Sequence, residues 1–104
     1  MGRLSAASVR EGKMEELVAH YKETVAPTYK ESEGFLGAYL LLDRTKGEAQ
    51  SLTLWRNVQD LENNNNNNPK YRQAMATFAP LFAESPRTSL FEIAVVVEKK
   101  GQDE

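Results

Sequence analysis

Two apolar runs joined by a short polar turn occupy the middle of the chain. Residues 34–42 and 51–55 are both too short for stable helices, and their apolar and aromatic side chains favour strands. Residues 43–48 between them are polar and include Gly47, which can supply the positive φ that hairpin turns commonly need. The pattern therefore predicts a β-hairpin.

A helical segment precedes this hairpin. From Met14 to Tyr29, apolar residues recur every three or four positions, which is typical of a helix with one buried face. Pro27 lacks a backbone N–H and crowds the preceding turn, so we expect a kink or break over residues 23–26. Gly34 is expected to end the segment. Residues 4–9 form a short first strand ahead of it.

A second helical segment follows the hairpin. Asn57 is placed to cap its first turn, and residues 58–62 form a short first piece. The six consecutive asparagines at 63–68 predict a polar loop, because Asn side chains compete for their own backbone hydrogen bonds. Asn68-Pro69 then restarts the helix, with Pro at its first position. We expect a kink or an early end near Pro80.

The last predicted strand covers residues 89–98, which are rich in β-branched side chains, and residues 99–104 form a polar tail. The order of elements is therefore β-α-β-β-α-β, the split βαβ arrangement of a ferredoxin-like α+β domain with an antiparallel sheet. A chain of 104 residues is typical of one domain, which we place at residues 1–98.

In the second and last predicted strands, the side chains on both faces are largely apolar. Tyr39 alternates with Leu40 in one strand, and Val95 alternates with Val96 in the other. A strand with one face in water alternates polar and apolar residues, so both faces of these strands are expected to be buried. The chain supplies no third layer. We therefore expect a homodimer through the sheet face, with Leu40 and Val95 in the interface.

Composition and charge narrow the classes of partner. A net charge of -2 gives no basic surface for nucleic acid, and no apolar stretch approaches the ~20 residues that span a membrane. The first residues lack the apolar core of a signal peptide, so we expect a soluble cytoplasmic protein without a membrane partner. With no Cys and a single histidine, His20, expected in solvent, we predict no metal site and no cofactor.

Several phrases of the sequence, in their order and spacing, resemble a known family. They are Glu33-Gly34-Phe35, the hairpin end Ser51-Leu52-Thr53-Leu54-Trp55, Asp60-Leu61, and Tyr71…Phe78…Pro80-Leu81-Phe82. Over residues 3–97 the chain resembles antibiotic-biosynthesis-monooxygenase-like domains of the dimeric α+β barrel superfamily. The resemblance implies two sheets packed into a barrel across a dimer, with a pocket between sheet and helices in each subunit.

The resemblance also implies an activity. Its haem-degrading members carry Asn, Trp and His at places that fall near Ser5, Asn64 and Ala74 here, which disfavours haem degradation. Its cofactor-independent members form quinones and need a pocket that orients a phenol-like substrate with Trp, Tyr and amide side chains. The substrate-binding candidates that this implies here are Trp55, Tyr39, Tyr71, Tyr21 and Ser51.

Two functions stay open from the sequence, which identifies no catalytic residue. One is a cofactor-independent monooxygenase that acts on a small aromatic or quinol-like compound. The other is a non-catalytic dimeric module that binds a small apolar or aromatic ligand. Trp55 and the tyrosines favour the monooxygenase, whereas Ser51, standing where an amide is expected, favours the binding module.

Overall fold

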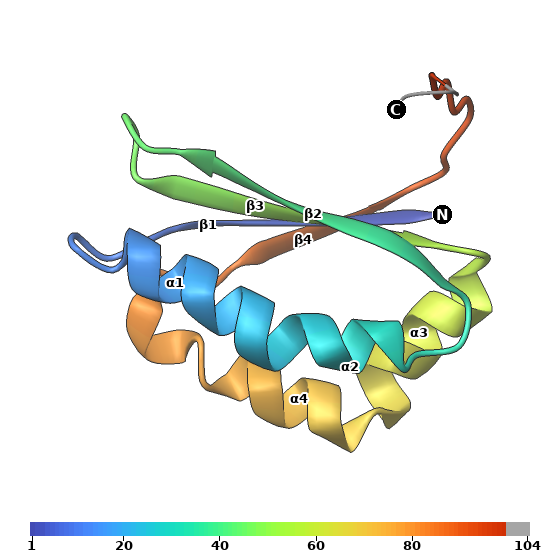
Figure 1. Cartoon of the computed structure of the whole chain (residues 1–104), viewed down its shortest axis with the longest axis horizontal. Helices are drawn as coiled ribbons and strands as arrows, with labels where there is room; N and C mark the ends of the chain where they lie inside the picture. Colours follow the sequence, from blue (N-terminus) through green and yellow to red (C-terminus); the bar gives the residue numbers. More distant parts are fainter. Residues whose placement is uncertain (100–104) are drawn as a thin grey trace.

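The computed structural model describes residues 1–99, and one antiparallel sheet with helices on one face forms its framework (Figure 1). The strand order is β2-β3-β1-β4. The strands are β1 (Gly2–Ser8), β2 (Phe35–Asp43), β3 (Glu48–Trp55) and β4 (Arg87–Phe91). The helices are α1 (Met14–His20), α2 (Ala26–Lys30), α3 (Val58–Asn67) and α4 (Pro69–Ala76), with a π-helical segment η1 (Tyr21–Val25) and a 3-10 helix η2 (Ala79–Leu81). The predicted ferredoxin-like α+β fold is confirmed.

The last strand is shorter than predicted. β4 ends at Phe91, because its partner β1 begins at Gly2, and these two residues are paired. The pairing with β1 ends at this pair, so the predicted strand is wrong beyond Phe91. Residues 92–99 leave the sheet as an arm without regular structure, drawn in red in Figure 1, on the side away from the helices. Of the predicted polar tail, residues 100–104 lie outside the described residues.

The first helical segment changes its winding where Pro27 was expected to disturb it. The π-helical segment η1 follows α1 directly, and α2 then begins with Pro27 in its first turn. Because Pro27 has no N–H to donate, the wider turn before it absorbs the lost hydrogen bond without breaking the segment. Leu17, Val25 and Tyr29 of this segment all reach the core.

The asparagine run is helical, which corrects the predicted loop. α3 continues to Asn67, and Asn64 within it is buried. The Asn64 Oδ1 atom lies 2.8 Å from Ser32 Oγ and accepts a hydrogen bond from Asn68 Nδ2 at 3.2 Å. These contacts with Ser32 in the turn after α2 and with Asn68 at the end of α3 outweigh the modest helix propensity of Asn. The chain bends only at Asn68, whose side chain caps α4 as predicted, by accepting from the Tyr71 N–H.

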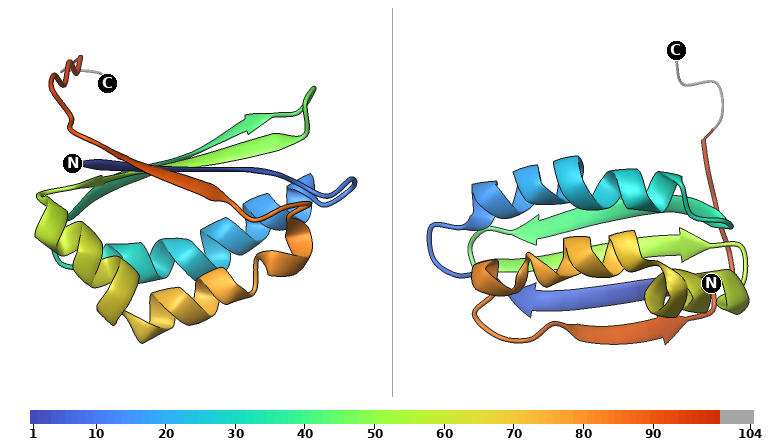
Figure 2. Two further views of the ribbon diagram at one scale, coloured as in Figure 1. Left: turned by 180° about the vertical axis from the view of Figure 1, so that it is seen from behind. Right: turned by 90° about the horizontal axis from the view of Figure 1, so that it is seen from below.

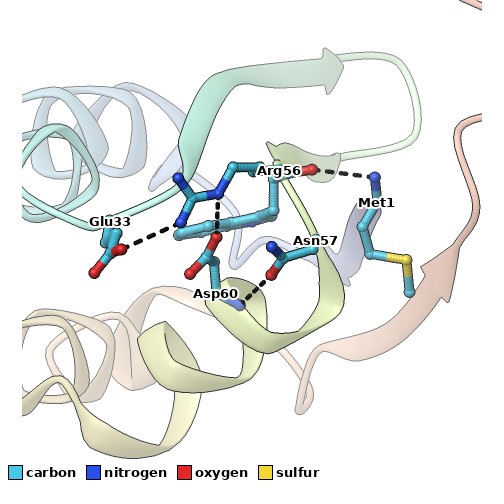
Figure 3. A network of polar contacts seen from close by, with 6 residues as sticks. Met1, Glu33, Arg56, Asn57 and Asp60 are labelled. Carbon is cyan, nitrogen blue, oxygen red and sulfur yellow. Dashed lines mark hydrogen bonds and ion pairs between the residues drawn. The ribbon is translucent and has the colours of Figure 1, made fainter.

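A polar network fixes the junction where β3 ends and α3 begins (Figure 3). Arg56 donates from Nε to the Asp60 carboxylate at 2.9 Å and from Nη2 to Glu33 at 3.2 Å. These two acceptors raise the pKa of Arg56. Asn57 caps α3 as predicted, since its Oδ1 accepts the Asp60 backbone N–H at 2.9 Å. The network ties α3 to the loop that enters β2.

The helices bury one face of the sheet and leave the other face exposed (Figure 2). A β-bulge between Phe35 and Gly37 shifts the register of β2 against β3. As a result Leu36, Tyr39 and Leu41 share the outer face, at 66%, 57% and 47% exposure. Leu40 lies on the inner face and packs against the core, so its predicted place in a sheet-face interface is wrong.

Candidate functional site

A cavity of about 460 Å³ lies between the sheet and the helices. Its volume suits a small ring-containing ligand. Most of its wall is apolar, with a few hydroxyl groups, one amide and one charged group. The lining residues are Arg3, Ser5, Ala6, Ala7, Leu17, Tyr21, Tyr29, Leu40, Ala49, Ser51, Asn65, Tyr71, Met75, Phe78, Phe82, Pro86 and Thr88.

Strand alternation determines which sheet residues form the floor of this cavity. Because successive side chains point to opposite faces, β1 presents Arg3 and Ser5 to the helices. On β3 the same alternation presents Ser51, which is paired with Ser5. Pro86 and Thr88 are exposed at the β4 edge, which lies beside the helices rather than beneath them (Figure 2, right). We therefore place the entrance at this edge.

One wall of the cavity carries a cluster of Arg3 and two tyrosines. Arg3 is only 4% exposed, and its Nη2 donates to the Tyr71 hydroxyl at 2.8 Å and to the Tyr29 hydroxyl at 3.2 Å. The Tyr29 hydroxyl donates in turn to Tyr71 at 3.4 Å. The Tyr71 oxygen thus accepts twice, and its own hydrogen is left to donate toward a ligand. Burial raises the pKa of Tyr29, which keeps this phenol neutral.

A second polar pair spans the cavity from η1 to β3. The Tyr21 hydroxyl and Ser51 Oγ lie 2.8 Å apart. Burial raises the pKa of Tyr21, and the Ser51 hydrogen bond opposes that shift. Because both groups are neutral hydroxyls, the pair can either donate to a ligand oxygen or accept from a ligand hydroxyl.

The structure brings together three of the five candidate binding residues. Tyr21, Tyr71 and Ser51 line the cavity, and their role in binding stays a prediction. Trp55 and Tyr39 are not among the lining residues, contrary to expectation. Trp55 is fully buried, where its Nε1 donates to Thr53 Oγ1 at 2.9 Å. Tyr39 lies on the outer face of the sheet, because the bulge in β2 shifts which side chains point outward.

Sequence reasoning missed Arg3, Tyr29 and Asn65 as lining residues. Tyr29 belongs to the apolar stripe and was expected only in the core. Arg3 could have been found, because a charged residue at an inward position of a strand is unusual and needs a partner or a function. Asn65 was hidden by the asparagine run, since only a helical conformation turns it toward the cavity.

His20 is half-buried rather than fully exposed, which corrects the prediction. Its two ring nitrogens contact the hydroxyls of Thr77 and Thr24, and its ring packs edge-on against Phe78. The side chain therefore stabilises the helix layer. Among residues 1–99, no group of His, Cys, Asp and Glu side chains is arranged to hold a metal ion. Within the same range, none of the helices has the length and apolar character needed to cross a bilayer.

Comparison with known proteins identifies the family of this chain. The model of the antibiotic biosynthesis monooxygenase family matches residues 4–77. The chain therefore belongs to the antibiotic biosynthesis monooxygenase family. No curated protein sequence matches it.

Solved structures show the same fold at low sequence identity. SnoaB from Streptomyces nogalater, described as a cofactor-independent oxygenase, has a TM-score of 0.78 at 14% identity, covering 94% of this chain and 96% of SnoaB. Rv0793 from Mycobacterium tuberculosis has a TM-score of 0.72 at 15% identity, covering 96% and 97%. NE2512 from Nitrosomonas europaea, a protein of unknown function, has a TM-score of 0.76 at 13% identity, covering 96% and 94%.

Proposed function

We propose that this chain is a cofactor-independent monooxygenase that acts on a small aromatic, quinol-like compound. The observation that carries the proposal is the cavity, which combines apolar walls with neutral hydroxyls and one guanidinium. Membership of the antibiotic biosynthesis monooxygenase family supports it, as does the likeness in fold to SnoaB, a cofactor-independent oxygenase.

The reaction needs no external reductant when the substrate itself supplies all the electrons. A phenol with a free para C–H reacts with O₂ to give a para-quinone and water. The para carbon gains one oxygen atom as a carbonyl, while the other oxygen atom leaves as water with the hydrogens of the C–H and the phenol O–H. The substrate is oxidised by four electrons and O₂ is reduced by four. The protein has to bind the ring, orient it and exclude water.

The cavity residues can perform these tasks. Leu17, Met75 and Phe78 provide apolar surface for the ring. The hydroxyls of Tyr71 and of the Tyr21–Ser51 pair can fix the ring oxygens by hydrogen bonds. Fixing the ring in one orientation is the source of rate acceleration that such a wall can offer.

Oxygen uptake tests this proposal. The protein is mixed with a panel of phenols and naphthols that have a free para C–H, and O₂ consumption is followed with an electrode. We expect uptake above the buffer rate for at least one compound, with about a tenfold loss in Tyr71→Phe, since one oriented hydrogen bond is removed. Arg72→Ala is the control, because residue 72 is exposed and is not a lining residue. The absence of uptake with every compound would contradict the proposal.

The alternative is a non-catalytic module that binds a small aromatic ligand. One observation favours it, because neither histidine nor a carboxylate is among the lining residues of the cavity. Such a side chain is the usual general base for removing a proton from a phenol. Saturable binding of a phenol without oxygen uptake would support this function over the monooxygenase.

We further propose that a second copy of this chain covers the outer face of the sheet. Leu36, Tyr39 and Leu41 of β2 and Phe91 of β4 are exposed there, and Val95 and Val97 extend the apolar surface along the arm. An exposed apolar sheet face of this kind marks an interaction site. The dimeric α+β barrel that the sequence resemblance implies places a second sheet on this same face.

The outer face can be tested by sedimentation at micromolar concentration. We expect a dimer for the wild type, and a shift to monomer for Leu41→Asp, because a charge would be buried in an apolar interface. Val58→Asp is the matched control, since Val58 on α3 is 44% exposed against 47% for Leu41. A monomeric wild type, or a Leu41→Asp variant that dimerises as tightly as the control, would rule out this interface.

A further inference from the structure

Arg3 carries the one charge in the wall of the cavity. All other lining residues are apolar or neutral polar side chains. No carboxylate lines the cavity, and none of the ion pairs formed within residues 1–99 involves Arg3. Because Arg3 is 4% exposed, its guanidinium is a buried cation without an anion. Buried charges in proteins are ordinarily paired, so this arrangement needs an explanation.

The neighbouring tyrosines do not neutralise this cation. Burial holds the Tyr29 phenol in its neutral form, so it accepts the Arg3 hydrogen bond as a hydroxyl. The described hydrogen bonds of Arg3 all come from Nη2. A guanidinium has five N–H donors, and the remaining ones belong to a residue that lines the cavity. The guanidinium carbon also lies 5.3 Å from the centroid of the Tyr71 ring, a contact that stabilises the cation without neutralising it. Donors and a net positive charge therefore stay available to a ligand.

We propose that the cavity binds its ligand as an anion, with the Arg3 guanidinium as counter-ion to an ionised oxygen on an aromatic ring. The oxygen is a carboxylate or a phenolate, which share the same recognition chemistry. Tyr71 assists, because its oxygen accepts from Arg3 and Tyr29 and its hydrogen is free for the same ligand oxygen. The apolar wall opposite holds the ring. This inference rests on the proposed function in taking the cavity as the ligand site.

Anion binding here would also favour the proposed reaction. A phenolate reacts with oxygen far more readily than its phenol, because it gives up electrons more easily. A cation at the oxygen lowers the pKa of the bound phenol and so raises the phenolate fraction. The proton leaves to solvent, directly or relayed by a hydroxyl in the wall, and no side-chain carboxylate is required. Arg3 thus supplies what a missing general base would otherwise supply.

The test compares ligands that differ in charge and little in shape. Binding of 2-naphthoate and of its neutral isostere 2-naphthamide is measured by calorimetry for the wild type, Arg3→Met and Arg3→Lys. We expect the wild type to prefer the naphthoate by at least about tenfold, the order of a charged hydrogen bond. Arg3→Met keeps the side-chain length and should lose the preference, whereas Arg3→Lys keeps the charge and should retain part of it.

A nitrophenol tests whether the ligand binds as a phenolate, because its absorbance reports its own ionisation. We expect the phenolate band to appear on binding to the wild type at a pH below the free compound's pKa, and not on binding to Arg3→Met. A response with the nitrophenol alone identifies a phenolate ligand, and a response with the naphthoate alone identifies a carboxylate ligand. Equal affinity for naphthoate and naphthamide together with no nitrophenol shift in the wild type would overturn the inference. So would a charge preference that survives in Arg3→Met.

These measurements do not depend on turnover. Selective anion binding without oxygen uptake leaves the inference standing and rejects the monooxygenase. The reverse result is oxygen uptake with a phenol whose pKa does not change on binding, together with equal affinities for naphthoate and naphthamide. That result supports the monooxygenase and rejects the anion-binding inference. If Arg3→Met does not fold, the wild-type spectrum and the Arg3→Lys titration still decide the question.

Discussion

Replacing Trp55 by Phe separates the structural role of this residue from a role in the site. The Trp55 indole is fully buried, and its Nε1–H is the donor to Thr53 Oγ1, which is itself 1% exposed. Phe cannot donate this hydrogen bond, and an unsatisfied buried hydroxyl costs about 1–3 kcal/mol. Loss of the larger ring next to Phe35 and Tyr29 adds about 1 kcal/mol. We expect a total loss of about 2–4 kcal/mol in the free energy of unfolding.

The same variant should leave ligand affinity unchanged, because Trp55 is not a lining residue. Urea unfolding followed by far-UV circular dichroism, at one protein concentration for all variants, measures the stability. Calorimetry with a nitrophenol measures the affinity. Tyr71→Phe is the comparison variant, since it should cost affinity through the lost hydroxyl. It should also cost about 1–3 kcal/mol of stability, because the buried Arg3 and Tyr29 lose an acceptor. A folded Trp55→Phe variant with native stability and tenfold weaker binding would refute this reasoning.

Three further predictions concern the backbone, the tyrosines and the asparagine run. Gly34→Ala should destabilise by about 2–5 kcal/mol, because φ is +77° and an added Cβ would lie 2.1 Å from Asp60 Oδ2. Gly12→Ala, with φ of +80° and open space, should cost only about 1–2 kcal/mol in the same urea assay. The contribution of Tyr21 and Tyr29 to the free energy of unfolding should be constant below about pH 10 and fall above it, because their raised pKa values keep them protonated in the fold while the unfolded chain ionises. A series of urea curves above pH 9 checks this, and Tyr29→Phe should flatten the fall. Asn64→Ala should cost about 1–2 kcal/mol, since Ser32 and Asn68 each lose one of two partners and a buried side chain is truncated, whereas Asn66→Ala at an exposed site should stabilise by a few tenths. Equal effects of the two substitutions in thermal unfolding would contradict the helical conformation of the asparagine run.

Local signals in the sequence identified most of the framework. The hairpin around Gly47 and the caps at Asn57 and Asn68 depend on neighbours within a few residues, and all three are found in the structure. The asparagine run was misread because its helix depends on Ser32, which lies 32 residues from Asn64. Propensity alone carries no information about such a contact.

The candidate site was less predictable than the framework. Which residues line the cavity depends on the face of the sheet to which each side chain points, and so on the strand register. One extra residue in β2 decides that Tyr39 faces outward and Leu40 inward, and a bulge of this kind has no reliable signature in a single sequence. Trp55 lies at the predicted end of β3, but only the packed structure shows that Tyr29 and Phe35 enclose it. Arg3 could have been identified from the sequence, because a charged residue within a buried strand is unusual.

The most direct test of the account is an isotope experiment with ¹⁸O₂. The protein is incubated under ¹⁸O₂ with the phenol that gives the fastest oxygen uptake, and the quinone is examined by mass spectrometry while peroxide is assayed in parallel. A monooxygenase that uses this cavity should place one ¹⁸O atom in the quinone, release the other as water, form no peroxide, and lose the label in Tyr71→Phe in proportion to its lower rate. A quinone without ¹⁸O, or a wild type and Tyr71→Phe that label it equally fast, would contradict the proposed function.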